Sequence, residues 1–368
     1  MAQQAACERA DLFLVKIAIT HFRIISAGGL ETRLLNYVSH FIREGNEVTI
    51  IHAKRDSSLL LPGTVRLLRI PVRWLPRQLR MWWFGYRSHR ILQGGNFDLS
   101  LSLGRTPGQQ LLICPGTHRG FLHAMGRKIY SPPDLLNVYL DAKAFRTSKI
   151  ILAASKMISD ELRKLYNVPA EKIRVLYPPS DPHVFNFNHR TTRAYWQRHF
   201  GVHPLKKNFL FVSSGHLRKG LPLLLDVFRH LKKLPVHLWI AGSSVKTSLP
   251  ANVSYLGFVR NMAQLYSAMD ATIHPALYEP FGQIVSESLM CGTPVIISHK
   301  TGASELVLEN EGMVVQAFET ESWLNAIKQF LDKRWNVPEG FAERNGITPS
   351  KHVEALVTAW IEIGEWRH

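Results

Sequence analysis

The sequence predicts an α/β fold of two doubly wound domains, each built on a parallel sheet, that face each other across a cleft. Each half of the chain alternates short apolar segments with segments of helical periodicity, the pattern of strand–helix–strand units. The 368 residues are too many for one compact core. A break rich in prolines and polar residues at 177–190 is the strongest signal for a domain boundary.

The first half predicts one parallel sheet. The apolar segments that we expect to be buried strands are 13–19, 48–53, 97–103, 149–153 and 173–176. Apolar residues at helical spacing predict helices at 30–41 and 155–166, and Gly45 stands where a helix C-cap glycine belongs. Right-handed crossovers between such strands give a parallel sheet covered on both faces.

The second half repeats this organisation. The strands that we expect are 209–212, 236–241, 271–274 and 295–298, and the helices are 221–231, 262–268, 282–291, 321–331 and 351–366. We therefore divide the chain into a Rossmann-like domain at 1–180, a second at 191–350, and a C-terminal helix in 351–368 that can pack back on the first domain. Ligands of such sheets bind at the carboxyl ends of the strands.

Composition narrows the partners and the compartment. The net charge of +17 and pI near 9.9 favour nucleic acid, anionic lipid or a phosphorylated substrate. Cys7, Cys114 and Cys291 lack the spacing of a disulfide framework or zinc site and are expected to be small thiols in or near the core. No apolar run is long enough to span a bilayer, and Glu8 and Asp11 are atypical of a signal peptide. We expect a cytoplasmic protein.

The segment from Glu279 to Glu287 carries the strongest chemical signal. It follows a strand that ends at His274, and a helix is expected to start near Gly282. Free amides at residues 281–284 and the helix dipole would form an anion site. Carboxylates beside it can accept hydrogen bonds from sugar hydroxyls. Either acid alone could equally be a loop acid or an early-helix acid favoured by the dipole.

A cationic turn follows the strand at 209–212. Gly215, Arg218, Lys219 and Gly220 lie between this strand and the next helix. Arginine offers a fork of donors and lysine a point charge, which together suit a diphosphate. The alternative, a solvated helix start, is disfavoured because cations there oppose the helix dipole.

Two loops of the first half are further candidates. The glycine pair Gly28–Gly29 between strand and helix lets the backbone approach a phosphate or sugar, although a tight turn would also explain it. His118 lies in a loop after a strand and is expected to face the cleft, although a lone histidine is more often structural. The neighbouring Arg119 could meet an anionic acceptor.

These motifs together resemble the retaining GT-B glycosyltransferases of glycosyltransferase family four (group 1), which include bacterial lipopolysaccharide core glycosyltransferases. Glu279 and Glu287 match the family's two glutamates with seven residues between them. The run LMCGTPVI at 289–296 and the run TGASEL at 301–306 match the segments that follow in the family. The resemblance covers most of the chain and is strongest over 209–306.

The resemblance implies roles for these residues. Glu279 would face the donor sugar, Glu287 would bind the ribose, and Arg218 with Lys219 would bind the diphosphate and stabilise the leaving nucleotide. The residues expected to act in catalysis are Glu279, His118, Arg218 and Lys219. The residues expected to bind the donor are Gly28, Gly29, Gly215, Arg218, Lys219, Gly257, Phe258, Phe281, Gly282, Gln283, Ile284, Val285 and Glu287, with 242–244 lining the same pocket.

The resemblance also implies the reaction. A hexose would pass with retention from a UDP- or GDP-sugar on domain 191–350 to a lipid-linked or lipopolysaccharide-core saccharide on domain 1–180. No cofactor beyond the donor substrate is expected, and no metal, because the chain has no Asp-x-Asp triplet. The alternatives are a basic nucleic-acid-binding protein and a nucleotide-sugar epimerase on the same fold.

The segment 73–90 mixes cations with large aromatics. Such segments lie in membrane interfaces or bind single strands of nucleic acid, and an amphipathic helix with core aromatics is an equally good explanation. A lipid-linked acceptor favours the first reading. We therefore expect peripheral association with the anionic inner face of the inner membrane and no nucleic-acid partner.

Overall fold

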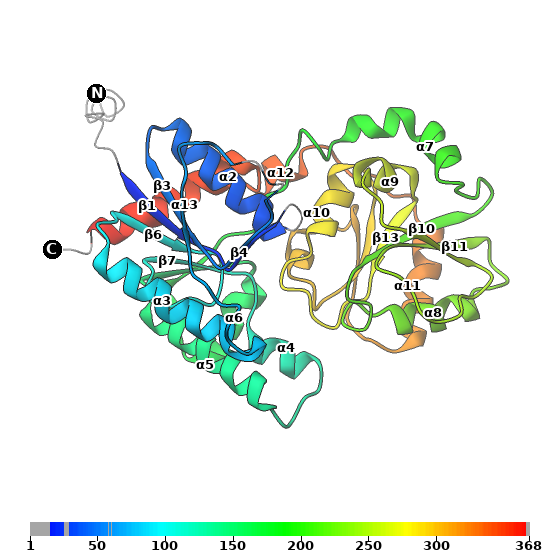
Figure 1. The fold of residues 1–368 in the computed structure, drawn as a ribbon. Coiled ribbons are helices and arrows are strands. Elements are labelled where there is room, and N and C mark those ends of the chain that lie inside the picture. The colour runs from blue at the N-terminus through cyan, green and yellow to red at the C-terminus, as the bar shows by residue number, and fades with distance from the viewer. Residues whose placement is uncertain (1–14, 26–28, 58, 60, 366–368) are drawn as a thin grey trace.

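The computed structural model describes residues 15–25, 29–57, 59 and 61–365. The chain forms two α/β lobes, each around a fully parallel sheet (Figure 1). The strands of the N-terminal sheet are β1 (Lys16–Thr20), β3 (Glu47–His52), β5 (Arg66–Arg69), β6 (Leu99–Ser102), β7 (Leu111–Cys114), β8 (Ile150–Ala153) and β9 (Ile173–Val175). A separate two-stranded ribbon pairs β2 (Arg23–Ile24) with β4 (Lys54–Arg55).

The N-terminal strands run in the order β5-β3-β1-β6-β7-β8-β9. This is the doubly wound arrangement, whose strand order reverses beside the first strand. The reversal lies between β1 and β6, where the connections leave on opposite faces and open a crevice at the carboxyl ends of the strands. The predicted strand at 13–19 begins at Lys16 among the described residues and extends to Thr20.

Helices cover both faces of this sheet. They are α2 (Gly29–Arg43), α3 (Arg80–Gly94), α4 (His118–Ala124), α5 (Pro132–Thr147) and α6 (Lys156–Tyr166). The sequence analysis missed α4 and α5. The helix α5 does not show a clean apolar stripe, although Ser131 and Asp134 form a capping box at its start.

The C-terminal strands are β10 (Lys207–Ser213), β11 (Val236–Gly242), β12 (Val253–Gly257), β13 (Ala271–His274), β14 (Val295–Ser298) and β15 (Gly312–Val315). Their order β12-β11-β10-β13-β14-β15 repeats the doubly wound pattern, with the reversal between β10 and β13. The helices around them are α7 (Arg193–His199), α8 (Leu221–His230), α9 (Met262–Ala268), α10 (Gln283–Met290), α11 (Thr320–Asp332) and α12 (Phe341–Arg344). All four strands predicted for this half are present.

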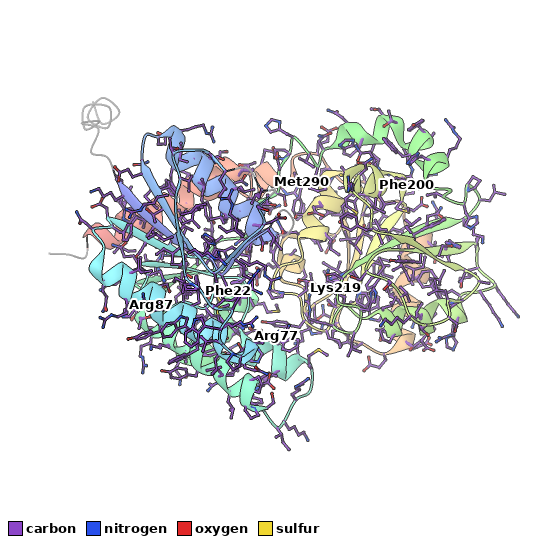
Figure 2. The ribbon with its side chains drawn as sticks, viewed as in Figure 1. Phe22, Arg77, Arg87, Phe200, Lys219 and Met290 are labelled. Carbon is purple, nitrogen blue, oxygen red and sulfur yellow. The ribbon has the colours of Figure 1, made fainter. Side chains whose placement is uncertain are left out.

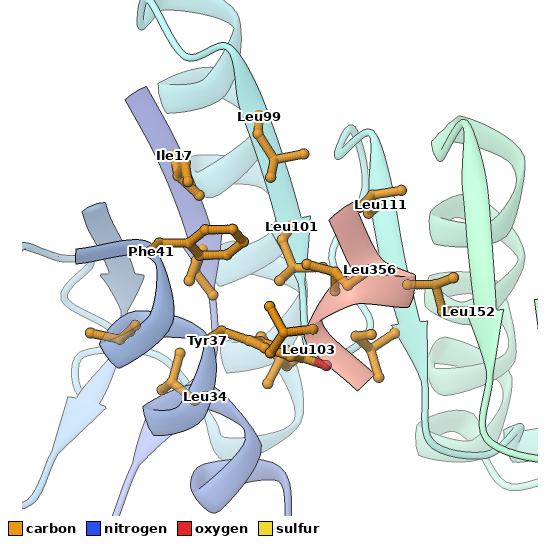
Figure 3. Close-up of a cluster of buried hydrophobic side chains, with 14 of the residues drawn as sticks. Ile17, Leu34, Tyr37, Phe41, Leu99, Leu101, Leu103, Leu111, Leu152 and Leu356 are labelled. Atoms are coloured by element: carbon orange, nitrogen blue, oxygen red, sulfur yellow. The ribbon is translucent and has the colours of Figure 1, made fainter. Parts of the chain in front are cut away.

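The last helix, α13 (Pro349–Glu365), returns to the N-terminal lobe. Figure 3 shows Leu356 of α13 among leucines of β6, β7 and β8. His352 stacks on Tyr37 of α2, and the ring nitrogen Nε2 lies 2.6 Å from the tyrosine oxygen. Truncating a buried leucine such as Leu356 to alanine typically costs about 2–5 kcal/mol. The two lobes are thus joined twice, by the segment at 177–190 and by α13.

Candidate functional site

A cleft of about 510 Å³ lies between the lobes, at the carboxyl ends of both sheets. Sequence-distant loops from both lobes form its walls. Its lining residues are Gly29, Leu30, Arg33, Arg105, Pro115, Gly116, Thr117, His118, Phe121, Ala154, Pro178, Arg218, Tyr278, Glu279, Pro280, Phe281, Gly282 and Gln283. This is where doubly wound sheets bind ligands.

The loop after β13 places Glu279 in this cleft. Its backbone is fixed because the Glu279 amide donates to the Lys300 carbonyl at 2.9 Å and its own carbonyl accepts from the Gly302 amide at 2.8 Å. The Glu279 side chain is only 15% exposed. A carboxylate that is buried must be paired, so its partners decide what it can do.

Three basic side chains surround the Glu279 carboxylate. Its oxygen Oε2 lies 3.2 Å from Nη1 of Arg218, 3.7 Å from Nζ of Lys219 and 3.5 Å from Nε2 of His274. Figure 2 labels Lys219 on the side of the C-terminal lobe that faces the N-terminal lobe. The two cations predicted for the turn after β10 and the acid predicted for the loop after β13 therefore form one cluster.

The cluster shifts the titration of its members. Burial alone would raise the pKa of Glu279, but the contact with His274 and the charges of Lys219 and Arg218 outweigh it and lower the pKa to about 2. Burial lowers the pKa of Lys219, against the attraction of Glu279. Burial also lowers the pKa of the fully buried His274 imidazole, which favours its neutral form. Glu279 is therefore ionised and accepts hydrogen bonds only.

The cationic turn depends on Gly220. Its φ is +83°, and a Cβ atom there would lie 2.1 Å from the carbonyl oxygen of Pro275. Only glycine fits this close approach. Arg218 also donates from Nη1 to the Tyr278 carbonyl oxygen. The turn is thus held against the Glu279 loop by backbone contacts as well as by charge.

Glu287 lies on the second turn of α10, as the sequence predicts. Its Oε2 accepts a hydrogen bond from the Tyr266 hydroxyl at 2.8 Å. Burial raises the pKa of Glu287, although Tyr266 and Lys219 oppose the shift. The side chain is distinct from the Glu279 cluster and is positioned by α9.

The start of α10 faces the cleft through Phe281, Gly282 and Gln283. Gly282 is the N-cap, with a φ of +93°, and the helix begins at Gln283. Residues Ile284 and Val285 complete the first turn. The Val285 amide donates to the Gly282 carbonyl at 2.9 Å, and the amides before it lie at the helix start, where no preceding turn supplies acceptors. The helix start, its dipole and the neighbouring cations form a site suited to an anion.

Gly29 brings the other lobe to this helix start. A Cβ atom on Gly29 would lie 1.9 Å from Oε1 of Gln283, so the start of α2 and the start of α10 touch. Gln283 also donates from Nε2 to the Pro179 carbonyl at 3.2 Å. The other member of the predicted pair, Gly28, lies outside the described residues.

Several predicted donor residues lie outside the lining of the cleft: Gly215, Lys219, Gly257, Phe258, Ile284, Val285 and Glu287. A Cβ atom on Gly215 or Gly257 would meet no other atom within 4 Å, so both glycines border open space. Phe258 is 77% exposed. Gly215 follows β10 and Gly257 ends β12, so they lie on the carboxyl edge of the same sheet.

His118 begins α4, so the expectation of a loop histidine is wrong. Thr117 caps this helix by accepting from the Gly120 amide. The His118 amide donates to Oδ2 of Asp141 at 2.7 Å, and its Nε2 lies 2.9 Å from Oδ1 of Asp134. Two carboxylates therefore fix the backbone and the ring of His118 at the cleft wall.

Arg119 does not line the cleft. Its guanidinium donates to the Leu165 carbonyl and lies 5.0 Å from the centre of the Tyr166 ring. The expectation that Arg119 meets an acceptor is therefore wrong. The sequence could not show that the end of α6 would occupy this side chain.

Tyr278 is a contact between the lobes that the sequence analysis missed. Its hydroxyl donates to Oε2 of Glu161 at 2.9 Å and accepts from the Thr117 amide at 3.2 Å. The neighbouring Pro280 carbonyl accepts from the Ser155 hydroxyl at 2.7 Å. The loop that carries Glu279 is thus attached to the N-terminal lobe.

Among the residues that the structure describes, no group of three His, Cys, Asp or Glu side chains could hold a metal ion. The two cysteines in this part of the chain, Cys114 and Cys291, are buried and free.

The comparisons with known proteins agree with this geometry. The family model of glycosyl transferases group 1 matches residues 196–345, and the model of glycosyltransferase family 4 matches residues 27–184. A probable transglycosylase of Burkholderia thailandensis is 32% identical over 287 residues, 78% of each chain. The lipopolysaccharide glucosyltransferase WaaG of Escherichia coli is 22% identical over 84% of this chain and 88% of its own.

Solved structures share the fold. The crystal structure of WaaG has a TM-score of 0.72 at 16% identity and covers 86% of this chain and 90% of its own. Anabaena HepE, solved with UDP and glucose, has a TM-score of 0.66 at 17% identity and covers 95% and 98%. The fold is therefore GT-B.

The two facing lobes and the acid–cation cluster define a glycosyltransferase. The chain belongs to the group 1 glycosyltransferases of family four.

Proposed function

We propose that the protein transfers a hexose, with retention, from a UDP- or GDP-sugar to a lipid-linked or lipopolysaccharide-core saccharide. The observation that carries this proposal is the cluster of Glu279, Arg218 and Lys219 beside the start of α10. The cations and the free amides suit the donor diphosphate, and the ionised Glu279 suits sugar hydroxyls. Relatives named as a lipopolysaccharide glucosyltransferase and as O-antigen mannosyltransferases support a hexose donor.

The residues would divide the reaction between them. Arg218 and Lys219 bind the diphosphate and stabilise the negative charge that develops on the leaving nucleotide. Glu279 holds the donor sugar, and Glu287 holds the ribose with the oxygen that Tyr266 does not use. His118, held by Asp134, faces the sugar from the other lobe. The leaving phosphate oxygen takes the proton from the acceptor hydroxyl on the same face of the sugar.

Donor binding tests the cluster. Wild-type protein is titrated with UDP-, GDP- and ADP-hexoses by isothermal calorimetry, beside Arg218→Ala/Lys219→Ala. A hydrogen bond to a charged group contributes about 1.5–3 kcal/mol, so losing two should weaken binding by roughly 10²–10⁴-fold. Equal affinities in the two proteins would overturn the assignment. Arg163→Ala, an exposed cation on α6, serves as the control.

Acceptor dependence separates transfer from the alternatives. With lipopolysaccharide-core oligosaccharide as the probe, nucleotide should be released only when both donor and oligosaccharide are present. An epimerase would instead convert the nucleotide sugar without releasing nucleotide. A nucleic-acid-binding protein would bind arbitrary DNA with steep salt dependence and would not bind any nucleotide sugar.

We further propose that the segment 73–90 binds an anionic membrane surface. Trp74, Trp82 and Tyr86 are 65%, 39% and 42% exposed, whereas Phe84 is buried against the sheet. The helix α3 therefore uses one aromatic for the core and presents others to the outside. Trp82 and Tyr86 stack with ring centroids 6.2 Å apart. None of the helices within the described residues combines the length and apolar composition that crossing a bilayer requires.

Cations accompany these exposed rings. Arg73, Arg77, Arg87 and Arg90 are exposed in the same segment, and Figure 2 labels Arg77 and Arg87 along it. Aromatic rings that enter the headgroup region and arginines that contact anionic lipid each contribute to the free energy of membrane binding, and the two contributions add. Such a surface would bring the enzyme to a lipid-linked acceptor.

Vesicle sedimentation tests the surface. Vesicles of phosphatidylglycerol and phosphatidylethanolamine should bind the wild type and release it at high salt. Trp82→Ala/Tyr86→Ala should weaken binding at least tenfold and leave affinity for the nucleotide sugar unchanged. Tyr195→Ala, an exposed aromatic on the other lobe, is the matched control. Equal binding by all three proteins would contradict the proposal.

A further inference from the structure

Arg33 is a buried cation that the donor site does not use. It lies on the second turn of α2 and lines the cleft, yet it is only 4% exposed. Its atoms Nε and Nη1 have no hydrogen-bond partner among the described residues. Burial lowers its pKa, and a contact with the Tyr37 hydroxyl opposes the shift. A buried guanidinium with unused donors is costly unless a ligand satisfies it.

Nearby carboxylates do not compensate this charge. Glu31 pairs with His21 at 3.5 Å, and Asp141 pairs with Arg105 at 2.6 Å. Within the part of the chain that the structure describes, Arg33 forms no ion pair with a carboxylate. The side chain therefore places an uncompensated positive charge at the wall of the cleft, with its unpartnered Nε and Nη1 buried.

The surroundings favour an anion. The helix α2 is 15 residues long and begins at Gly29, so the positive end of its dipole lies beside Arg33. Arg105 lines the same cleft as a second guanidinium, 34% exposed, and donates from Nη1 to Asn137 at 3.2 Å. Guanidinium groups and helix starts both match phosphate oxygens.

We propose that Arg33, the start of α2 and Arg105 form a second phosphate subsite, which binds a phosphate group on the acceptor. This inference rests on the proposed function, because it takes the acceptor to bind in the same cleft as the donor. Arg218 and Lys219 serve the donor diphosphate from the other lobe.

The cleft continues toward the N-terminal lobe in the way an acceptor site requires. A second cavity of about 420 Å³ shares Leu30 and Arg105 with the cleft and reaches the carboxyl ends of β1, β6 and β7. Its polar lining includes His21, Arg23 and Ser102. The rest of a phosphorylated saccharide can occupy this cavity while its phosphate lies at Arg33.

Two probes and matched variants test the subsite. Inorganic phosphate and UDP are titrated into the wild type, Arg33→Met and Arg218→Ala/Lys219→Ala. The first variant should bind phosphate at least tenfold more weakly than the wild type and bind UDP within twofold of it. Arg218→Ala/Lys219→Ala should bind UDP at least tenfold more weakly than the wild type and should still bind phosphate. Arg33→Lys, which keeps the charge but not the fork, should fall between wild type and Arg33→Met in phosphate affinity.

Each contrary outcome leads to a different conclusion. Unchanged phosphate affinity in Arg33→Met, or a wild type that does not bind phosphate, would overturn the subsite. An equal loss of UDP and phosphate would assign Arg33 to the donor diphosphate. If the wild type binds phosphate through Arg33 but binds no nucleotide sugar, the proposed function fails and the anion site stands.

Thermal melting without ligand separates the subsite from a structural role. Removal of an unpaired buried charge should leave the melting temperature of Arg33→Met equal to or above that of the wild type. A lower melting temperature for Arg33→Met would mean that the side chain serves packing with Tyr37 and would count against the proposal.

Discussion

Neutralising Glu279 should destabilise the C-terminal lobe at neutral pH. Glu279→Gln keeps the shape of the side chain and removes the negative charge that pairs with Arg218 and Lys219 beside His274. The pKa falls from an ordinary 4.5 to about 2, and each pKa unit corresponds to about 1.4 kcal/mol. The cluster therefore favours the carboxylate by about 3 kcal/mol. For a lobe of this size, that lowers the melting temperature by about 6–12 °C.

The pH dependence gives the sharper test. Because the folded pKa of Glu279 lies below the unfolded value, its stabilisation is complete above pH 4.5 and disappears as the pH falls toward 2. Wild type and Glu279→Gln are therefore compared by urea unfolding at pH 7, 5 and 3. We expect the difference in the free energy of unfolding between the two proteins to have its full value at pH 7 and pH 5 and to be smaller at pH 3. A Glu279→Gln protein as stable as the wild type at pH 7 would refute the reasoning.

A control isolates the effect of burial. Glu354 pairs with Lys351 at 2.8 Å on the exposed face of α13, where both side chains are 64% exposed. Glu354→Gln should change the free energy of unfolding by less than about 1 kcal/mol, because exposed ion pairs contribute little.

Three further outcomes follow from single contacts. Gly220→Ala places a Cβ against the Pro275 carbonyl at a φ of +83°; it should cost more than about 2 kcal/mol in urea unfolding and weaken UDP binding in calorimetry. Tyr278→Phe removes a donor from the half-buried Glu161 and should cost about 1–3 kcal/mol in thermal melting, with a larger radius of gyration in small-angle scattering if the lobes separate. Burial lowers the pKa of His352 to about 3, so stability should fall as the pH drops below 6.5 in the wild type and fall less in His352→Gln.

Most residues of the candidate site on the C-terminal lobe could be predicted from the sequence, because they lie close together along the chain. Glu279 and Glu287 lie on one strand–loop–helix unit, and Arg218 and Lys219 lie on another. Each strand of a parallel sheet ends at the same edge, so both units had to meet there. The structure adds that Glu279 contacts the two cations directly.

The contacts between the lobes could not be predicted in this way. Tyr278 and Glu161 are separated by 117 positions, and neither belongs to a recognisable motif. Arg33 lies in an amphipathic helix where a cation normally faces solvent. Its burial depends on packing beside Tyr37, which hydrophobic periodicity does not encode. The position of His118 was found, but its place at the start of α4 was missed because seven residues give little periodic signal.

For the segment 73–90, the sequence could not predict which aromatic side chains are buried and which are exposed. Composition allowed the aromatics to be core or interfacial in equal measure. Phe84 proved to be core, whereas Trp82 and Tyr86, which lie two residues before and after it, are exposed. Only the direction of each side chain on α3 distinguishes them.

A crystal structure with UDP would test whether the Arg218–Lys219 turn and the start of α10 bind the donor diphosphate. We expect the two phosphates to contact the Arg218 guanidinium, the Lys219 ammonium and the first amides of α10, with the ribose on Glu287. UDP with its phosphates on Arg33, or outside the cleft, would contradict the account.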